Sequence, residues 1–273
     1  MKILTLNTHS WLEENPEKKL QQLAEKITQE SYDLIALQEV NQKTASEVIT
    51  QPAGFCPCPQ QTEIHADNFA YCLVQLLKKA GISYFWSWEM SHIGYDIYQE
   101  GNALLSKHEI SPEAFLVSEK NDPADYRTRK LLLGETIIVE KKVTAISCHF
   151  SWWINETEGF AYEWRNLQSI LEKSSPLFLM GDFNNPDPGP GYQLLELETL
   201  GLADSFYAAE KKTGAATVVK KIDGWADNTE ALRIDYILLP KEAKVTTHQV
   251  VFDGENGPVI SDHFGVEVEM EEF

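Results

Sequence analysis

The amino-acid sequence predicts an α+β protein in which mixed β-sheets form a sandwich with helices on the outside. Apolar runs of strand length are frequent, whereas only about four stretches carry the periodicity of an amphipathic helix. Some neighbouring strands are joined by short polar turns and others by helical stretches, so antiparallel and parallel pairs are both expected. This mixture favours a sandwich over a doubly wound parallel fold. The 273 residues, 43% of them hydrophobic, contain no repeat or linker, so one domain over residues 1–273 is expected.

The first third of the chain is predicted to alternate strands with two amphipathic helices. Its apolar runs predict strands at 1–7, 32–40 and 83–90. Asn15 and Pro16 are favoured at the N-cap and first position of a helix, which is expected to extend to about Glu30. The second helix is expected between Asp67, a suitable N-cap, and Gly81, a natural stop.

The middle of the chain is predicted to contain mostly antiparallel strands. Its apolar segments predict strands at 102–106, 110–119, 131–140 and 143–148. Lys141 and Lys142 separate the last two strands and are expected to form the turn of a hairpin. Polar loops are expected at 91–101 and 120–130.

The C-terminal part is predicted to hold two more helices, one from about Gly159 and one around 192–200. Between them, the strand at 177–181 consists of apolar or small residues and should be buried on both faces. Residues 203–229 are expected to be rich in loops. Further strands are predicted at 233–239, 245–253 and 266–270.

The charge of the chain restricts the partners that it can bind. Lys and Arg number 23 against 42 Asp and Glu, which gives a net charge of −19 at pH 7. Because nonspecific nucleic-acid binding is largely electrostatic, long nucleic acid is not an expected partner, although a local basic groove could persist. No stretch of about 18 apolar residues predicts a membrane span. The N-terminus lacks the features of an export signal, so the protein is expected to be cytoplasmic.

The four cysteines are expected to be reduced and structural. Cys56 and Cys58 are spaced as in some metal or redox sites, but no second pair at a suitable spacing accompanies them. Cys72 falls in a predicted helix and Cys148 in a predicted strand, where a small apolar thiol is common.

Polar side chains occur at or near the ends of apolar strands in separate parts of the chain. Asp182 and Asn184 follow the strand at 177–181, and their spacing in an extended chain points them to the same side. Similar positions are held by Asn7, Glu39, His149, Asp235, Asp262 and His263. Each position alone has an ordinary structural interpretation: a glutamate or aspartate can pair with a nearby base, and a lone histidine is more often structural than catalytic.

Convergence of these side chains in one wet cleft would explain all of them together, because each buried polar group otherwise carries its own desolvation cost. An oxygen-rich set without cysteine suits a hard cation such as Mg²⁺ or Mn²⁺. Two histidines next to carboxylates suit proton transfer. The sequence therefore predicts a site that can bind a hard cation and transfer protons.

Five segments resemble the motifs of the endonuclease/exonuclease/phosphatase superfamily and occur in the order of that family. They are Asn7 after the first strand, Gln38-Glu39, Gly181-Asp182-Phe183-Asn184, Arg233-Ile234-Asp235-Tyr236 and Ser261-Asp262-His263-Phe264. The segments span nearly the whole chain, and together they are highly specific although each alone is weak. The resemblance implies a four-layer α/β/β/α sandwich of two mixed sheets with outer helices. It also implies metal-dependent hydrolysis of a phosphoric ester at one edge of the sheets.

The resemblance further implies which matched residues hold the metal and the attacking water. Glu39 would be the main ligand of Mg²⁺, or of Mn²⁺, helped by Asn7 and, through water, by Asp262. Asp182 would position or deprotonate the attacking water, and Asn184 would hold a phosphate oxygen.

For the histidines, the resemblance implies roles in proton transfer and in phosphate binding. His263 would act as a base or stabilise the phosphate, oriented by Asp235, and His149 would hydrogen-bond the phosphate or serve as an acid. Tyr98 and Glu100 resemble the pair that supports this second histidine in nuclease members. Which residue is the general base stays open. The complete set meets the needs of water attack on a phosphoryl group, namely charge neutralisation, positioning and a base.

Aromatic and basic residues near these motifs bear on the substrate. Trp152 and Trp153 could stack on a sugar or a base, pack in the core, or dip into a membrane, but no basic patch accompanies them. Arg127 and Arg129, together with Lys130, could hold a single phosphate or form a solvated loop.

The expected activity is that of a phosphomonoesterase that releases phosphate from a small phosphorylated sugar, preferably a disaccharide that spans the tryptophans. Bacterial members of the family include sugar-phosphate phosphatases. A DNA endonuclease or exonuclease is the first alternative, and a sphingomyelinase-like phosphodiesterase is the second. The sequence does not indicate an oligomeric state.

Overall fold

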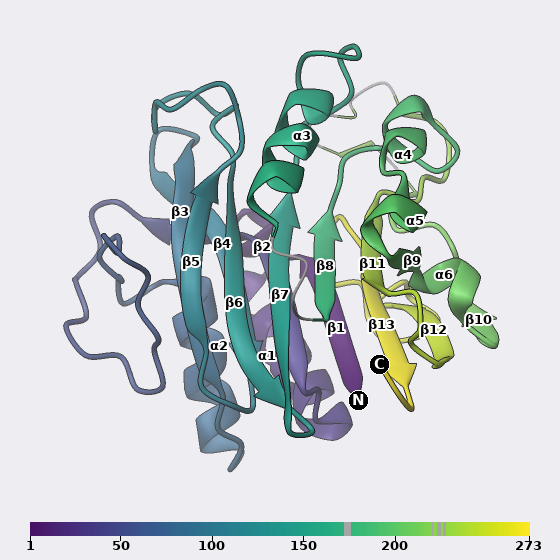
Figure 1. The fold of residues 1–273 in the computed structure, drawn as a ribbon. Coiled ribbons are helices and arrows are strands. Elements are labelled where there is room, and N and C mark those ends of the chain that lie inside the picture. The colour runs from purple at the N-terminus through teal and green to yellow at the C-terminus, as the bar shows by residue number, and fades with distance from the viewer. Residues whose placement is uncertain (172–175, 220, 223–224, 226–227) are drawn as a thin grey trace.

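The computed structural model describes residues 1–171, 176–219, 221–222, 225 and 228–273 (Figure 1). Within these residues, two mixed β-sheets pack face to face, and helices cover the outer face of each sheet. The predicted four-layer α/β/β/α sandwich is therefore confirmed. Of the helices in the described ranges, none combines the length and the apolar character that crossing a bilayer requires.

The first sheet has the strand order β10-β12-β13-β1-β2-β4-β3 in the described part of the chain. At its centre, β1 pairs in parallel with β2 and antiparallel with β13. β2 also pairs antiparallel with β4, and a β-bulge interrupts this pairing between Leu37 and Val40. The strands are β1 (Lys2–Asn7), β2 (Leu34–Lys43), β3 (Phe85–Gly94), β4 (Tyr98–Ser106), β10 (Lys211–Thr213), β12 (Val245–Val251) and β13 (Gly265–Met270).

The second sheet has the order β5-β6-β7-β8-β11-β9 among the described residues. β7 pairs in parallel with β8, whereas β11 pairs antiparallel with β8. The C-terminal ends of β7 and β8 therefore meet the start of β11 at one edge of the sheet. The strands are β5 (Ser111–Leu116), β6 (Lys130–Ile138), β7 (Lys141–His149), β8 (Leu177–Asp182), β9 (Leu202–Asp204) and β11 (Asp235–Pro240).

Figure 1 shows α1 and α2 on one side of the two sheets and α3 on the other. The apolar faces of α1 and α2 pack on the first sheet, and those of α3, α4 and α5 pack on the second. The helices are η1 (Ser10–Leu12), α1 (Pro16–Glu30), α2 (Phe69–Lys79), α3 (Phe160–Ile170), α4 (Pro190–Leu194), α5 (Leu197–Leu200) and α6 (Ser205–Ala208).

The core between the sheets is apolar and fully buried. Alternate side chains of each strand point inward, so every second residue joins this layer. Both sheets contribute to it, the first through Ile3, Leu34 and Leu104 and the second through Leu132, Phe178 and Ile237. These packed sheets hold the strand ends in fixed positions.

The largest difference from the predicted elements lies at residues 91–101, which were expected to form a polar loop. β3 instead continues to Gly94 and β4 already begins at Tyr98, so the two strands form one long hairpin. His92 and Glu100 pair across it. Their side chains face a polar cavity rather than an apolar core, and the polar sequence therefore gave no strand signal.

Smaller differences concern turns and helix ends. The β6–β7 turn lies at Val139 and Glu140, not at the two lysines, and both turn residues have a positive φ, of 49° and 62°. Neither residue type is typical of such a turn, which usually contains Asn, Asp or Gly. Asn68, rather than Asp67, caps α2 by accepting a hydrogen bond from Tyr71 N.

Near the C-terminus, the predicted helix at 192–200 is divided into α4 and α5. The predicted loop at 203–229 contains the short elements α6 and β10 and part of β9. Its residues 220, 223–224 and 226–227 lie outside the described part of the chain.

Candidate active site

Three adjacent strands of the second sheet place polar side chains side by side at one edge. His149 at the end of β7 is the register partner of Asp182 at the end of β8, and Asp182 is also the partner of Asp235 at the start of β11. The antiparallel direction of β11 explains why its site residue opens the strand rather than closing it. The structure thus brings these three predicted residues together.

The first sheet contributes Asn7 and Glu39 to the same edge. Asn7 Nδ2 donates hydrogen bonds to Glu39 Oε1 at 2.8 Å and to Asp182 Oδ2 at 3.1 Å, so this one amide joins the two sheets. Glu39 lies in the bulge of β2 with a φ of 50°. This left-handed conformation is uncommon for a residue with a side chain, so the surroundings of Glu39 must hold it.

His263, in the turn between β12 and β13, forms a pair with Asp235. Its Nδ1 lies 2.9 Å from Asp235 Oδ2, and its Nε2 lies 3.7 Å from Asp182 Oδ2. Burial alone would lower the pKa of this histidine. The charges of Asp235 and then Asp182 outweigh the burial, so the pKa lies well above 6.5. His263 is therefore a cation between two carboxylates.

Asp182 is almost completely buried at the centre of the cluster. Burial raises its pKa from 3.8 to about 7, and the charge of Asp235 adds to this, while His263 acts in the opposite direction. Asn184 N donates to Asp182 Oδ1 at 2.8 Å. A carboxylate with a pKa near neutrality can take up or release a proton under physiological conditions.

His149 has the opposite electrostatic environment. Its Nε2 lies 3.8 Å from Asp182 Oδ2 and 3.9 Å from Glu39 Oε1. Burial, and then the positive charge of Arg129, lower the pKa of this imidazole well below 6.5, so it is neutral. The two histidines of the site therefore differ in charge.

Asn184 is held firmly by its neighbours. Its Nδ2 donates to Phe150 O at 2.9 Å, and its Oδ1 accepts a hydrogen bond from Trp225 Nε1 at 3.0 Å. Its φ of 52° is a second positive value at the site. These contacts fix the orientation of the amide beside Asp182.

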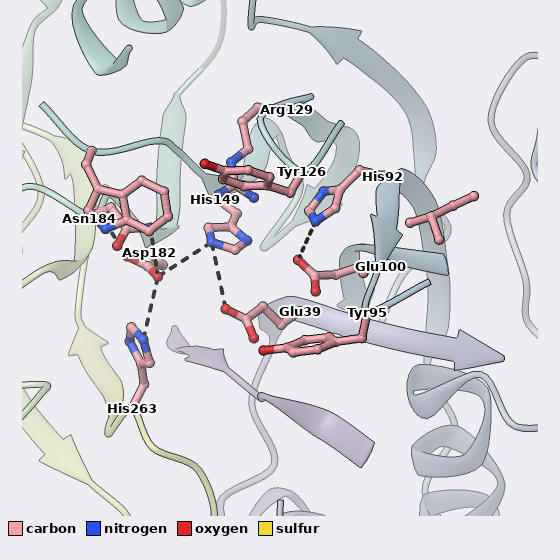
Figure 2. Close-up of a pocket in the computed structure, with 13 residues that line it drawn as sticks. Glu39, His92, Tyr95, Glu100, Tyr126, Arg129, His149, Asp182, Asn184 and His263 are labelled. Carbon is pink, nitrogen blue, oxygen red and sulfur yellow. Dashed lines mark hydrogen bonds and ion pairs between the residues drawn. The ribbon is translucent and has the colours of Figure 1, made fainter. Parts of the chain in front are cut away.

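The cluster forms one end of a cavity of about 520 Å³ (Figure 2). This volume is in the usual range for a small-molecule site. Figure 2 shows His92, Tyr95 and Glu100 of the β3–β4 hairpin at the other end, and Arg129 and Tyr126 beside His149 between the two ends. The lining residues are Glu39, His92, Ile93, Gly94, Tyr95, Glu100, Tyr126, Arg129, His149, Trp152, Asp182, Asn184 and His263.

The sequence analysis did not select His92, Tyr95 and Tyr126 in this cavity. They lie in segments that carry no motif, and only the long hairpin brings the first two to the site. His92 Nε2 lies 3.4 Å from Glu100 Oε1, so this glutamate is next to His92. Figure 2 shows this pair on the far side of the cavity from His263. Within residues 91–101, the only available signal was the pair of tyrosines, Tyr95 and Tyr98.

Several predicted site residues are not among those that line the cavity. Arg127 is exposed and paired with Asp125. Trp153 packs against the apolar cluster between the second sheet and α3. Tyr98 is buried in β4. Asn7 and Asp235 lie behind the lining side chains that they contact.

Asp262 belongs to a neighbouring cluster with His9 and Glu13. Its Oδ1 lies 3.8 Å from His9 Nδ1, which is 2.9 Å from Glu13 Oε1. Burial alone would lower the pKa of His9, but the hydrogen bond to Glu13 and the charge of Asp262 raise it to about 9. The sequence analysis did not select His9, which directly follows the first strand.

The donor set of the site fits a divalent cation. In the described ranges, the groups able to hold one include Glu39 with His149 and Asp182, and Asp262 with His9 and Glu13. Burial and the nearby charge of Asp262 raise the pKa of Glu39. The ionised form of Glu39 is therefore unfavourable next to the second acid. A cation shared by these oxygens would remove that cost.

Comparisons with known proteins agree with the fold. A model of the Endonuclease/Exonuclease/phosphatase family matches residues 9–263. A solved structure of a protein of that family from Leptotrichia buccalis C-1013-b is 34% identical, with 99% of each chain covered and a TM-score of 0.86. No curated protein matches the chain.

More distant solved structures share the fold. The mannosyl-6-phosphatase Bt3783 from Bacteroides thetaiotaomicron VPI-5482 is 16% identical, with 99% of each chain covered and a TM-score of 0.68. TDP2 from D. rerio, complexed with a single-strand DNA product, is 15% identical, with 99% of this chain and 98% of that chain covered and a TM-score of 0.63.

The sandwich, with acids, amides and histidines gathered at its edge, defines a hydrolase of phosphoester bonds. More particularly, the chain belongs to the Endonuclease/Exonuclease/phosphatase family.

Proposed function

We propose that this protein is a Mg²⁺-dependent phosphomonoesterase that releases inorganic phosphate from a small phosphorylated sugar. Maltose 6′-phosphate is the example that we favour, which would make the protein a maltose 6′-phosphate phosphatase. The observation that carries this proposal is the division of the cavity into two ends. A charged cluster suited to a phosphate lies at one end, and aromatic and hydrogen-bonding side chains suited to a sugar lie at the other.

At the charged end, the protonation states suit attack by water on a phosphomonoester. Asp182, with a pKa of about 7, would accept a proton from the water as its oxygen bonds to phosphorus. His263, whose pKa lies well above 6.5, would stabilise the negative charge and return a proton to the departing sugar oxygen. Neutral His149 would donate a hydrogen bond to a phosphate oxygen, as would Asn184.

The oxygens of Asn7, Glu39 and Asp262 would hold the Mg²⁺, with Mn²⁺ as a substitute. The cation would supply neutralisation of the phosphate charge. Asn7 would also keep Glu39 and Asp182 in fixed relative positions, because its amide donates to both.

At the other end, the side chains suit a hydroxylated ring. Tyr95 and Tyr126 line the cavity and are 57% and 59% exposed, so a ligand in the cavity can contact their rings. Trp152 lines the cavity next to Arg129, and its buried Nε1 has no hydrogen-bond partner among the described residues, so it can donate to an oxygen of the ligand. Aromatic faces with a few fixed polar groups are typical of small-ligand sites.

The structural relatives include a sugar-phosphate phosphatase and a protein solved with DNA. Bt3783 is named for a sugar-phosphate substrate, and TDP2 was solved with a DNA product. The net charge of −19 favours the small substrate, because long nucleic acid would be repelled. We accordingly propose neither a nucleic-acid nor a membrane partner.

A substrate panel in Mg²⁺ buffer tests the proposal. It contains sugar monophosphates, inositol phosphates, plasmid DNA, an abasic-site duplex and sphingomyelin, and it scores both phosphate release and strand nicking. We expect phosphate release from a sugar monophosphate. Efficient nicking without phosphate release from any sugar would instead support the nuclease.

A further inference from the structure

Arg129 is a buried arginine that forms no ion pair with any residue in the described ranges. It is only 4% exposed, it lines the cavity, and its Nε has no hydrogen-bond partner in the described part of the chain. None of the ion pairs among the described residues includes it. The other deeply buried arginine, Arg233, pairs with both Asp187 and Asp204. Burial of an unpaired charge is costly, so a site that keeps one usually uses it.

The position of Arg129 is fixed by its backbone. Its N donates to Ser118 Oγ at 2.7 Å, and its carbonyl accepts from Val117 N at 3.0 Å. Its guanidinium lies 6.0 Å from the centre of the Trp152 ring. Figure 2 shows the side chain directed into the cavity beside His149 and Tyr126.

The charge of Arg129 acts on the phosphate end of the cavity. Burial, and then the charge of Arg129, lower the pKa of both His149 and His92, so both imidazoles stay neutral and add no positive charge. Glu163 also feels this charge, but its two oxygens are occupied by Ser151 N and Oγ at 2.8 and 2.7 Å. The positive charge of Arg129 is therefore available to a ligand.

We propose that Arg129 binds the second negative charge of a phosphomonoester and makes the cavity select terminal phosphates over phosphodiesters. The proposal deepens the proposed function and rests on it. Above the second pKa of a phosphoryl group, about 6, a monoester is a dianion, whereas a diester carries one charge. A guanidinium matches two oxygens of a terminal phosphate in a bidentate manner. In a diester, one of those oxygens carries a substituent.

The test measures binding without turnover. Inorganic phosphate and dimethyl phosphate are titrated in Mg²⁺ buffer at about pH 8, where phosphate is a dianion. The proteins are the wild type, Arg129→Met, Arg129→Lys and, as a matched control from the same loop, Arg127→Met. Arg127 is exposed and already paired with Asp125.

We expect Arg129→Met to weaken phosphate binding about tenfold or more, since it removes charge-assisted hydrogen bonds, and to change dimethyl phosphate binding less than about threefold. Arg129→Lys keeps the positive charge but loses the bidentate guanidinium, so its affinity for phosphate should lie between those of the wild type and Arg129→Met. Arg127→Met should bind like the wild type. Because none of the ion pairs among the described residues includes Arg129, Arg129→Met should lower the melting temperature far less than loss of an ion-paired arginine would.

Equal losses for both anions, or no loss of phosphate binding, would overturn the role of Arg129. A marked fall in melting temperature for Arg129→Met, with both affinities unchanged, would assign the residue to structure. Wild-type and Arg129→Met turnover of para-nitrophenyl phosphate and its methyl diester then separates the two proposals. A wild type that hydrolyses only the diester refutes the phosphomonoesterase and the selectivity together, whereas a monoesterase with an unchanged ratio in the variant refutes the selectivity alone.

Discussion

Asp182 is the residue on which both sheets converge. It accepts hydrogen bonds from Asn7 of the first sheet and from the backbone of Asn184, and it lies between His149 and His263. Its ionised form is costly because it is buried next to Asp235. Burial of the ionised Asp182 lowers the stability of the folded protein at neutral pH. The same burial raises the pKa of Asp182 to a value suited to a general base at that pH.

This conflict predicts opposite effects of Asp182→Asn on activity and stability. Folding raises the pKa of Asp182 from 3.8 to about 7, so the folded protein binds a proton that the unfolded chain releases. The resulting stabilisation is complete below about pH 4 and is lost as the pH rises through about 7. In chelator, the melting temperature of Asp182→Asn should therefore increasingly exceed that of the wild type as the pH rises over this range.

The same variant should lose at least about 100-fold in kcat because it cannot take up the proton. Thermal melts across pH and steady-state kinetics on the folded variant test both effects. A melting difference that does not change with pH would contradict the account of its burial.

Trp152 and Trp153 are adjacent in sequence but differ in environment. Trp152 lines the cavity, and Trp153 packs against the apolar cluster under α3. Trp152→Ala should raise KM with little change in melting temperature. Trp153→Ala should lower the melting temperature, by loss of roughly 1–3 kcal/mol of partly buried packing, with little change in KM. The reverse pattern in kinetics and melts would show that the cavity does not hold the substrate there.

At the scale of elements, Arg233 ties the start of β11 to the segment after β8. Its guanidinium pairs with Asp187 and, at 2.7 Å, with Asp204 Oδ2. Arg233→Met leaves both acids without a counter-ion and should cost about 3–5 kcal/mol in urea unfolding. Arg129→Met, which removes an arginine of similar burial without ion pairs, is the matched control and should cost much less. Equal losses would show that the ion pairs do not stabilise these elements.

The strand-end residues could be predicted from the sequence because their environment is set locally. A buried apolar run predicts a strand, and the polar residue at which the run stops, such as Asp182, His149 or Asn7, shows which end of the strand lies at the site. Periodicity alone predicts a mixed-sheet sandwich with outer helices. The four-layer arrangement was predicted from the resemblance to a family.

The second end of the cavity could not be predicted in the same way. β3 and β4 turn polar side chains toward the cavity at His92 and Glu100, so the period of a strand is hidden there. The bulge that aims Glu39 depends on a positive φ that its residue type does not signal. The sequence could not show that Arg129 forms no ion pair with the described residues, because ion pairing depends on tertiary packing. Its sequence neighbours, Arg127 and Lys130, are each paired with an acid.

At the scale of the whole molecule, a chain of net charge −19 concentrates acids where it must bind an anion. We therefore expect its site to need a divalent cation. Chelator should abolish activity, and Mg²⁺ or Mn²⁺ should restore it. Mg²⁺ should also raise the melting temperature of the wild type by relieving repulsion between Glu39 and Asp262, and Glu39→Gln should lose most of this rise. Full activity in chelator, or restoration by Zn²⁺ but not by Mg²⁺, would contradict the predicted set of oxygen ligands.

The central claim is that water attacks a terminal phosphate of a sugar in this cavity. Phosphorus NMR of maltose 6′-phosphate, incubated with the protein and Mg²⁺ in water enriched in heavy oxygen, tests it most directly. The account predicts inorganic phosphate that carries one oxygen from the solvent, and no such product with Asp182→Asn. Phosphate without solvent oxygen would contradict attack at phosphorus. An unchanged sugar phosphate, under conditions in which the same protein cleaves a phosphodiester, would contradict the monoesterase itself.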